Sequence, residues 1–255
     1  SLRTVPREVL LNAAFPLEVG QEYPIDELIA RLTAAGYSRC GMVEGSGQFA
    51  VRGGIIDIFP PTFFAEGGEE TDGKPKPIRI ELFGDEVDRI GVFDVESQRF
   101  LFHVDAVEFP PAREVLPTKE ALEGIRAAIS AHFARSKNEN ACREMVSEVA
   151  AIDTCLQNGD TDLKFADKYI SLIYPERVCL LDYFDDRSLV LVRSMGAVNE
   201  RLASFERQIS TTVTDLLEGG TIAAKHAEYA CPVARYKGFL SENVTVYLDS
   251  LLQGL

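Results

Sequence analysis

Residues 47–61 read GQFAVRGGIIDIFPP, and this stretch decides the fold of the first half of the chain. GQFAVR alternates apolar and polar residues and IIDIFP runs apolar, so both segments are predicted to be strands. Gly53 and Gly54 lie between them. No lysine lies near these glycines and no helix is predicted after them, so the stretch lacks the features of a phosphate-binding loop. We expect a β-element in which the glycines let the backbone bulge beside Arg52.

The neighbouring segments extend this element into a small α+β unit over residues 15–109. Before it, apolar residues recur at helical spacing from Ile25 to Leu32, which predicts a helix preceded by Pro24 and capped at its C-terminus by Gly36. After it, residues 62–77 are acidic and rich in glycine and proline, which predicts a loop. IRIELFGDEVDRIGVFD (78–94) and QRFLFHVDAVEFPP (98–111) return to the strand pattern. The sequence therefore predicts one helix followed by a mostly antiparallel sheet.

The second half, residues 110–255, is predicted to be a helix-rich α/β region. Residues 1–14 are predicted to be an N-terminal linker or an edge of that α/β domain. An amphipathic helix is expected after Thr118, short helices over residues 139–184, and a buried strand over residues 187–193. A long helix follows, and its predicted inward stripe consists of Val198, Leu202, Phe205, Ile209, Val213 and Leu216. The predicted fold class is thus α+β, followed by part of an α/β domain.

Composition narrows the classes of function. Acidic residues outnumber basic ones 40 to 26, giving a net charge of -14, which argues against a nucleic-acid-binding surface on this chain. No apolar run approaches the ~20 residues that cross a bilayer, so no membrane association is expected. The five scattered cysteines fit a reducing cytoplasm. The start SLRTVPREVLL lacks both an initiator methionine and a signal-peptide pattern, so we expect a segment cut from within a longer protein.

Motifs for catalysis and metal binding are absent from the sequence. There is no G-x-x-x-x-G-K-[ST] loop and no G-x-S-x-G motif. His103, His132 and His226 are far apart and have no partner at metal-ligand spacing. We therefore predict no catalytic residue, no metal site and no cofactor in this chain, and leave open whether it is part of an enzyme.

The alternation in IRIELF (78–83) indicates which side chains leave the core. With Ile78 and Ile80 inside, Arg79 and Phe83 project from the other face. An arginine and an aromatic residue on one exposed strand face are typical of protein contacts. The alternative is a surface ladder of arginine and glutamate with Phe83 packed under the loop 60–77. The face pattern does not decide between them.

The motif run GYSRCGMVEGSGQFAVRGGIIDIFPP, IRIELFGDEVDRIGVFDVESQRF and PAREVL resembles the bacterial transcription-repair coupling factors (Mfd). It resembles the excision-repair protein UvrB less closely. The resemblance is strong from about residue 15 to 120 and thinner through LLDYFDDRSLVLV (180–192). It implies a UvrB-like module that recruits UvrA, with Arg52, Arg79 and Phe83 at the contact, followed by part of a degenerate UvrB-like domain. The long acidic loop 62–77 departs from the family pattern.

In that family the full-length protein is an ATP-hydrolysing DNA translocase that displaces stalled RNA polymerase. The resemblance implies that the modules that bind RNA polymerase, double-stranded DNA and ATP lie outside this chain. A cytoplasmic location is expected. The alternative is a UvrB-type excinuclease fragment that takes part in ATP-dependent handling of damaged DNA, which predicts nucleotide or DNA binding by the chain itself.

Overall fold

A computed structural model describes residues 2–66, 74–158, 162–185 and 187–248 of the chain. The chain divides into two compact units, which we treat separately. We call Glu8–Lys119 with Cys155–Leu163 the β unit, and Ser1–Arg7, Glu120–Thr154 and Lys164–Leu255 the helical unit. The predicted boundaries after residues 14 and 109 stay predictions.

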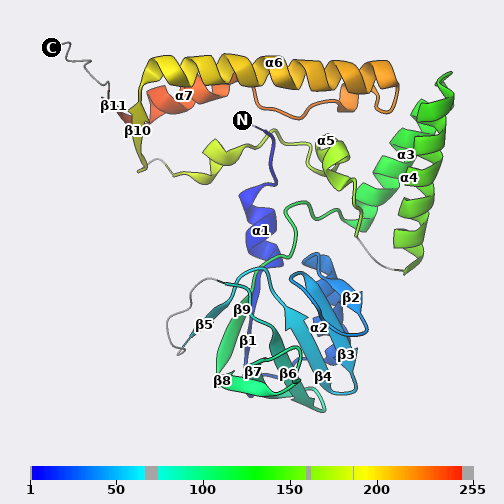
Figure 1. Cartoon of the computed structure of the whole chain (residues 1–255), viewed down its shortest axis with the longest axis vertical. Coiled ribbons are helices and arrows are strands. Elements are labelled where there is room, and N and C mark those ends of the chain that lie inside the picture. The colour runs from blue at the N-terminus through cyan, green and yellow to red at the C-terminus, as the bar shows by residue number, and fades with distance from the viewer. Residues whose placement is uncertain (1, 67–73, 159–161, 186, 249–255) are drawn as a thin grey trace. The chain divides into compact units, whose positions relative to one another are not determined.

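The β unit contains most of α1 (Arg7–Ala13) and the helix α2 (Ile25–Ala34), with two sheets (Figure 1). A six-stranded sheet has the order β2-β3-β4-β6-β7-β8, in which β2 and β3 are parallel and the other neighbours antiparallel. Its strands are β2 (Ser38–Cys40), β3 (Gln48–Arg52), β4 (Ile55–Phe59), β6 (Ile78–Phe83), β7 (Glu86–Phe93) and β8 (Phe100–Val104). The antiparallel order β1-β9-β5 forms a second sheet from β1 (Phe15–Glu18), β9 (Ala106–Phe109) and β5 (Phe64–Glu66).

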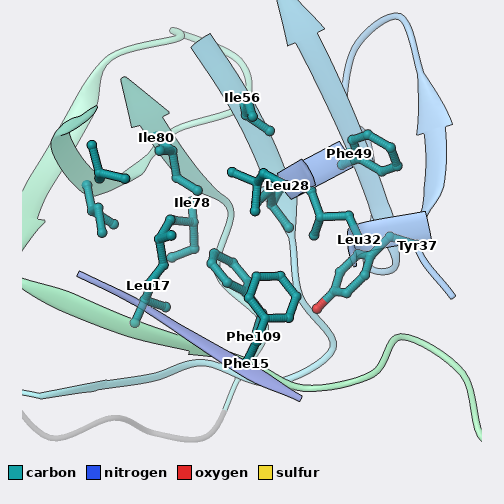
Figure 2. Close-up of a cluster of buried hydrophobic side chains, with 14 of the residues drawn as sticks. Phe15, Leu17, Leu28, Leu32, Tyr37, Phe49, Ile56, Ile78, Ile80 and Phe109 are labelled. Atoms are coloured by element: carbon teal, nitrogen blue, oxygen red, sulfur yellow. The ribbon is translucent and has the colours of Figure 1, made fainter. Parts of the chain in front are cut away.

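The core of the β unit lies where α2 and both sheets meet. Figure 2 shows the side chains that fill it: Phe15, Leu17, Leu28, Leu32, Tyr37, Phe49, Ile56, Ile78, Ile80 and Phe109. The rings of Phe15 and Phe109 lie 5.4 Å apart between centroids. Helix α2 follows Pro24 and gives way to Gly36 at φ 85°, so its predicted limits are confirmed within two residues. The core therefore covers one face of the six-stranded sheet.

A smaller cluster covers the other face of that sheet. Val43, Ala50 and Phe93 are buried there, with Phe59 and Phe100 packed against them. Ala50 follows Phe49, and Phe93 follows Val92, which both belong to the main core. Strand alternation therefore directs Ala50 and Phe93 to the opposite face. Part of the sheet face that the sequence marks as outward is therefore also packed.

Two local predictions for the β unit need correction. Gly53 and Gly54 do not form a bulge: they are the two-residue turn between β3 and β4, with φ 61° at Gly53 and Arg52 paired with Ile55. Glycine at the first turn position is what a type II′ hairpin requires. The predicted loop 62–77 also contains a strand, β5, which pairs with β9. Residues 67–73 of that loop lie outside the described residues.

The helical unit contains most of α3 (Lys119–Phe133), α4 (Glu139–Asn158), α5 (Ile170–Ile173), α6 (Met195–Gly219) and α7 (Val233–Glu242). The 3₁₀ turns Ala166–Tyr169, Leu180–Tyr183 and Ala224–His226 connect them, and β10 (Leu189–Arg193) pairs in parallel with β11 (Val244–Leu248). Short helices are expected over residues 139–184, but the first helix of this range, α4, is long. The strand predicted over residues 187–193 is present as β10, but the prediction that it is buried is wrong, because Leu189 and Leu191 are exposed.

The stripe predicted for the long helix is confirmed in α6, although its members are half-buried rather than fully covered. Taken together, the mostly antiparallel β unit and the helix-rich unit confirm the predicted fold class. Across the described ranges, none of the helices has the length and apolar character needed to span a membrane.

Candidate functional site

Two hairpin turns lie next to each other at one end of the six-stranded sheet. Arg52 is the last residue before the β3–β4 turn, and Phe83 is the last residue before the β6–β7 turn. The turns adjoin because β4 and β6 are antiparallel neighbours, and Leu82 N–H donates to the Gly54 carbonyl at 2.7 Å. A Cβ on Gly54 would lie 2.8 Å from the Leu82 oxygen, so this close approach requires glycine. Two of the predicted site residues therefore share one edge of the unit.

Phe83 is the most exposed large apolar side chain of the described residues, at 82% of its full accessible surface. Strand alternation explains this exposure, because Ile80 and Leu82 face the core and Phe83 faces away. The backbone beneath it is held firmly: Tyr23 N–H donates to Asp85 O at 2.6 Å and Gly20 N–H to Val87 O at 2.8 Å. The alternative in which Phe83 packs under the loop 60–77 is therefore wrong.

Arg79 projects from the predicted face, yet it is buried, with 8% of its surface exposed. Its Nε and Nη2 donate to the Asp57 carboxylate at 2.6 and 2.9 Å, and its Nη1 donates to the Gln98 carbonyl at 2.9 Å. Its guanidinium lies 4.4 Å from the centre of the Phe93 ring. The hydrogen bonds to Asp57 raise the pKa of Arg79 above its ordinary value. The expectation of an exposed Arg79 is corrected: the turn between β7 and β8 covers it.

Arg52 joins the same group from the solvent side. Its Nη2 donates to Asp57 Oδ2 at 2.5 Å and to Gln98 Oε1 at 3.1 Å, and 44% of its side chain is exposed. We call Arg52, Asp57, Arg79 and Gln98 the arginine cluster. Two guanidinium groups and one carboxylate give it one net positive charge, in a chain whose overall charge is -14. The cluster is thus a local cationic site beside Phe83.

Sequence reasoning missed two members of the cluster, Asp57 and Gln98. The sequence did contain a signal for Asp57. An aspartate inside the apolar run IIDIF is either buried with a partner for its charge or excluded from a buried strand. It is 1% exposed and opposes Arg79 across β4 and β6. Gln98 had none, since its role depends on how the β7–β8 turn folds back over the sheet.

The arrangement is suited to binding a protein surface. An exposed aromatic ring on a rigid hairpin, beside an arginine with free hydrogen-bonding capacity, is a frequent centre of protein interfaces. Within the ranges that the structure describes, no group of three or more histidine, cysteine, aspartate or glutamate side chains is placed to hold a metal ion.

Comparisons with known proteins show which proteins this chain is similar to. Residues 15–115 match the family described as the UvrB interaction domain. The chain is 31% identical over 221 residues to a transcription-repair-coupling factor of Bacillus subtilis, covering 85% of this chain and 18% of that protein. Proteins of the same name from Staphylococcus epidermidis and Staphylococcus aureus are 28% and 27% identical over 217 residues. The predicted resemblance is confirmed, and the chain spans about a fifth of the length of these relatives.

Proposed function

We propose that this chain, which carries a UvrB interaction domain and is similar to transcription-repair-coupling factors, is a protein-docking module that recruits UvrA. The contact surface in this proposal consists of Phe83 and Arg52, with Arg79 holding the surface together from beneath. The role belongs to nucleotide excision repair coupled to transcription.

The exposure of Phe83 carries the proposal. A partner that covers this 82% exposed phenylalanine removes its apolar surface from water, which favours binding. Burying such a side chain is worth about 1.5–3 kcal/mol. Arg52 adds a charged group that can pair with a carboxylate of the partner, which contributes mostly to specificity and to the rate of association.

The proposal also includes the displacement of RNA polymerase and the use of ATP. It assigns both activities to parts of a longer protein and not to the residues of this chain. In this proposal, the longer protein works in the cytoplasm and uses ATP to displace stalled RNA polymerase from double-stranded DNA. It thereby brings the docking module to the damaged site. The acidic balance of the chain, 40 acidic residues to 26 basic ones, supports a protein partner over direct DNA contact for this module.

The test is a titration of the chain with purified UvrA by calorimetry. Phe83→Ala should raise Kd by about 30-fold or more, because interface anchors are worth about 2 kcal/mol or more. Leu101→Ala is the matched control: Leu101 is 63% exposed on β8, and its removal should leave Kd unchanged. Equal affinity of the Phe83→Ala variant and the wild-type chain would contradict the proposal. Binding of ATP or DNA by the chain alone would instead support the UvrB-type alternative.

A further inference from the structure

Gln98, a member of the arginine cluster, has an unusual backbone conformation. Its φ is 60°, in the left-handed region that non-glycine residues seldom adopt. The turn around it is closed by its own N–H, which donates to Asp94 O at 2.8 Å, and by Asp94 N–H, which donates to Arg99 O at 2.9 Å. Its side-chain Nε2 donates to Val95 O at 2.7 Å. This last bond fixes the amide plane and directs Oε1 toward the arginines.

The two arginines use this oxygen differently. Arg79 Nη2 donates to it at 2.7 Å, and every nitrogen of Arg79 is engaged by Asp57 or Gln98. Arg52 donates to it at 3.1 Å through Nη2, the same nitrogen that bonds Asp57. Among the described residues, Arg52 makes these bonds through Nη2 alone. Its Nε and Nη1 N–H groups are therefore available to a partner.

We propose that Gln98 is a positioning residue, which together with Asp57 orients Arg52 for a carboxylate of the partner. The inference rests on the proposed docking function and deepens it. An arginine binds a carboxylate best through two parallel N–H groups, and an unrestrained arginine loses rotamer freedom when it does so. Fixing one nitrogen in advance reduces that loss, which is the general benefit of preorganisation. The partner site is accordingly an acidic residue beside an apolar socket for Phe83.

Local charge supports a carboxylate as the group that Arg52 meets. The neighbouring exposed arginine on the same face, Arg89, is paired with Glu81 at 3.4 Å within the chain. The arginine cluster keeps a net positive charge, because Asp57 is shared by two guanidinium groups. Arg52 is the member of the cluster that is both charged and exposed.

A double-mutant cycle on UvrA binding tests the inference. The four proteins are the wild-type chain, Gln98→Ala, Arg52→Ala and the double variant. Gln98→Ala should raise Kd about threefold to tenfold, the effect of freeing one long side chain. In the Arg52→Ala background the same change should have no further effect, because Gln98 acts through Arg52. Equal effects of Gln98→Ala in both backgrounds would overturn the inference.

A second substitution separates positioning from support of the turn. Gln98→Gly removes the side chain while favouring the left-handed backbone, so the turn should fold and Kd should still rise as in Gln98→Ala. Wild-type affinity of the Gln98→Gly variant would show that only the turn matters, and would overturn the inference. Gln208→Ala, which removes an exposed glutamine from α6, is the matched control. If Arg52→Ala and Phe83→Ala also bind normally, the docking function itself fails, which distinguishes the two failures.

Discussion

Replacing Arg79 by alanine should destabilise the β unit, whereas replacing Arg52 or Phe83 should leave it nearly as stable as before. Arg79→Ala removes a buried guanidinium that makes four hydrogen bonds, with donor–acceptor distances of 2.6 to 2.9 Å, to Asp57 and Gln98. It leaves Asp57, which is 1% exposed, with Arg52 as its remaining cationic partner.

The magnitude follows from burial. Breaking a buried ion pair by removing one partner costs about 3–5 kcal/mol. We expect about 3 kcal/mol, near the lower end, because Arg52 still bonds to Asp57. Arg52→Ala should cost at most about 1 kcal/mol, since the bidentate pair of Arg79 and Asp57 remains. Phe83→Ala should change the free energy of unfolding by about 0.5 kcal/mol or less, as is usual for exposed positions.

Urea unfolding followed by circular dichroism measures these differences. With a slope of about 1–3 kcal/mol per molar urea, Arg79→Ala should lower the midpoint by about 1–3 M. Arg89→Ala is the matched control, because Arg89 is an exposed arginine on the same sheet face, and its midpoint should stay close to that of the wild-type chain. An Arg79→Ala midpoint equal to that of Arg89→Ala would refute the structural role assigned to Arg79.

Three further outcomes follow from the structure. Gly54→Ala should lower the free energy of unfolding by about 1–3 kcal/mol, because the new Cβ would lie 2.8 Å from Leu82 O. Gly124→Ala, which has open space around its Cβ, should be neutral or stabilising in the same urea assay. Burial, with a contribution from neighbouring Cys179, raises the pKa of Cys231 from 9.0 to about 11. The buried thiol of Cys231 therefore contributes its full stability below pH 9, and this contribution is lost as pH rises through 11. Urea midpoints across this range should fall less steeply for Cys231→Ala than for the wild-type chain. Binding of UvrA should weaken with added salt in the wild-type chain and less so in Arg52→Ala, as titrations at several salt concentrations would show, whereas equal slopes would exclude an ionic role for Arg52.

Much of the β unit was predictable from periodicity alone. Alternation in IRIELF placed Ile78 and Ile80 inside and Phe83 outside, and the structure agrees. Gly53 and Gly54 also separated two predicted strands, and the structure places the end of β3 and the start of β4 there, with a turn instead of the expected bulge. These features are local, so a single sequence contains enough information to assign them.

The burial of Arg79 was not predictable in the same way. It depends on which strands are neighbours, since Asp57 reaches Arg79 only because β4 pairs with β6. It also depends on the turn at residues 94–99, where Gln98 adopts a left-handed conformation that its sequence does not signal. Alternation tells which face a side chain takes, and it does not tell what covers that face. The same reason explains why Leu189, on an apolar strand, is exposed.

The most direct test of the central claim is photo-crosslinking from position 83. A benzophenone-bearing phenylalanine placed there should crosslink to UvrA when the two proteins are mixed, and excess wild-type chain should suppress the product. The same group at position 101, an exposed site on β8, should give little crosslinking. Efficient crosslinking from position 101 and none from position 83 would contradict the assignment of the hairpin tip as the docking surface.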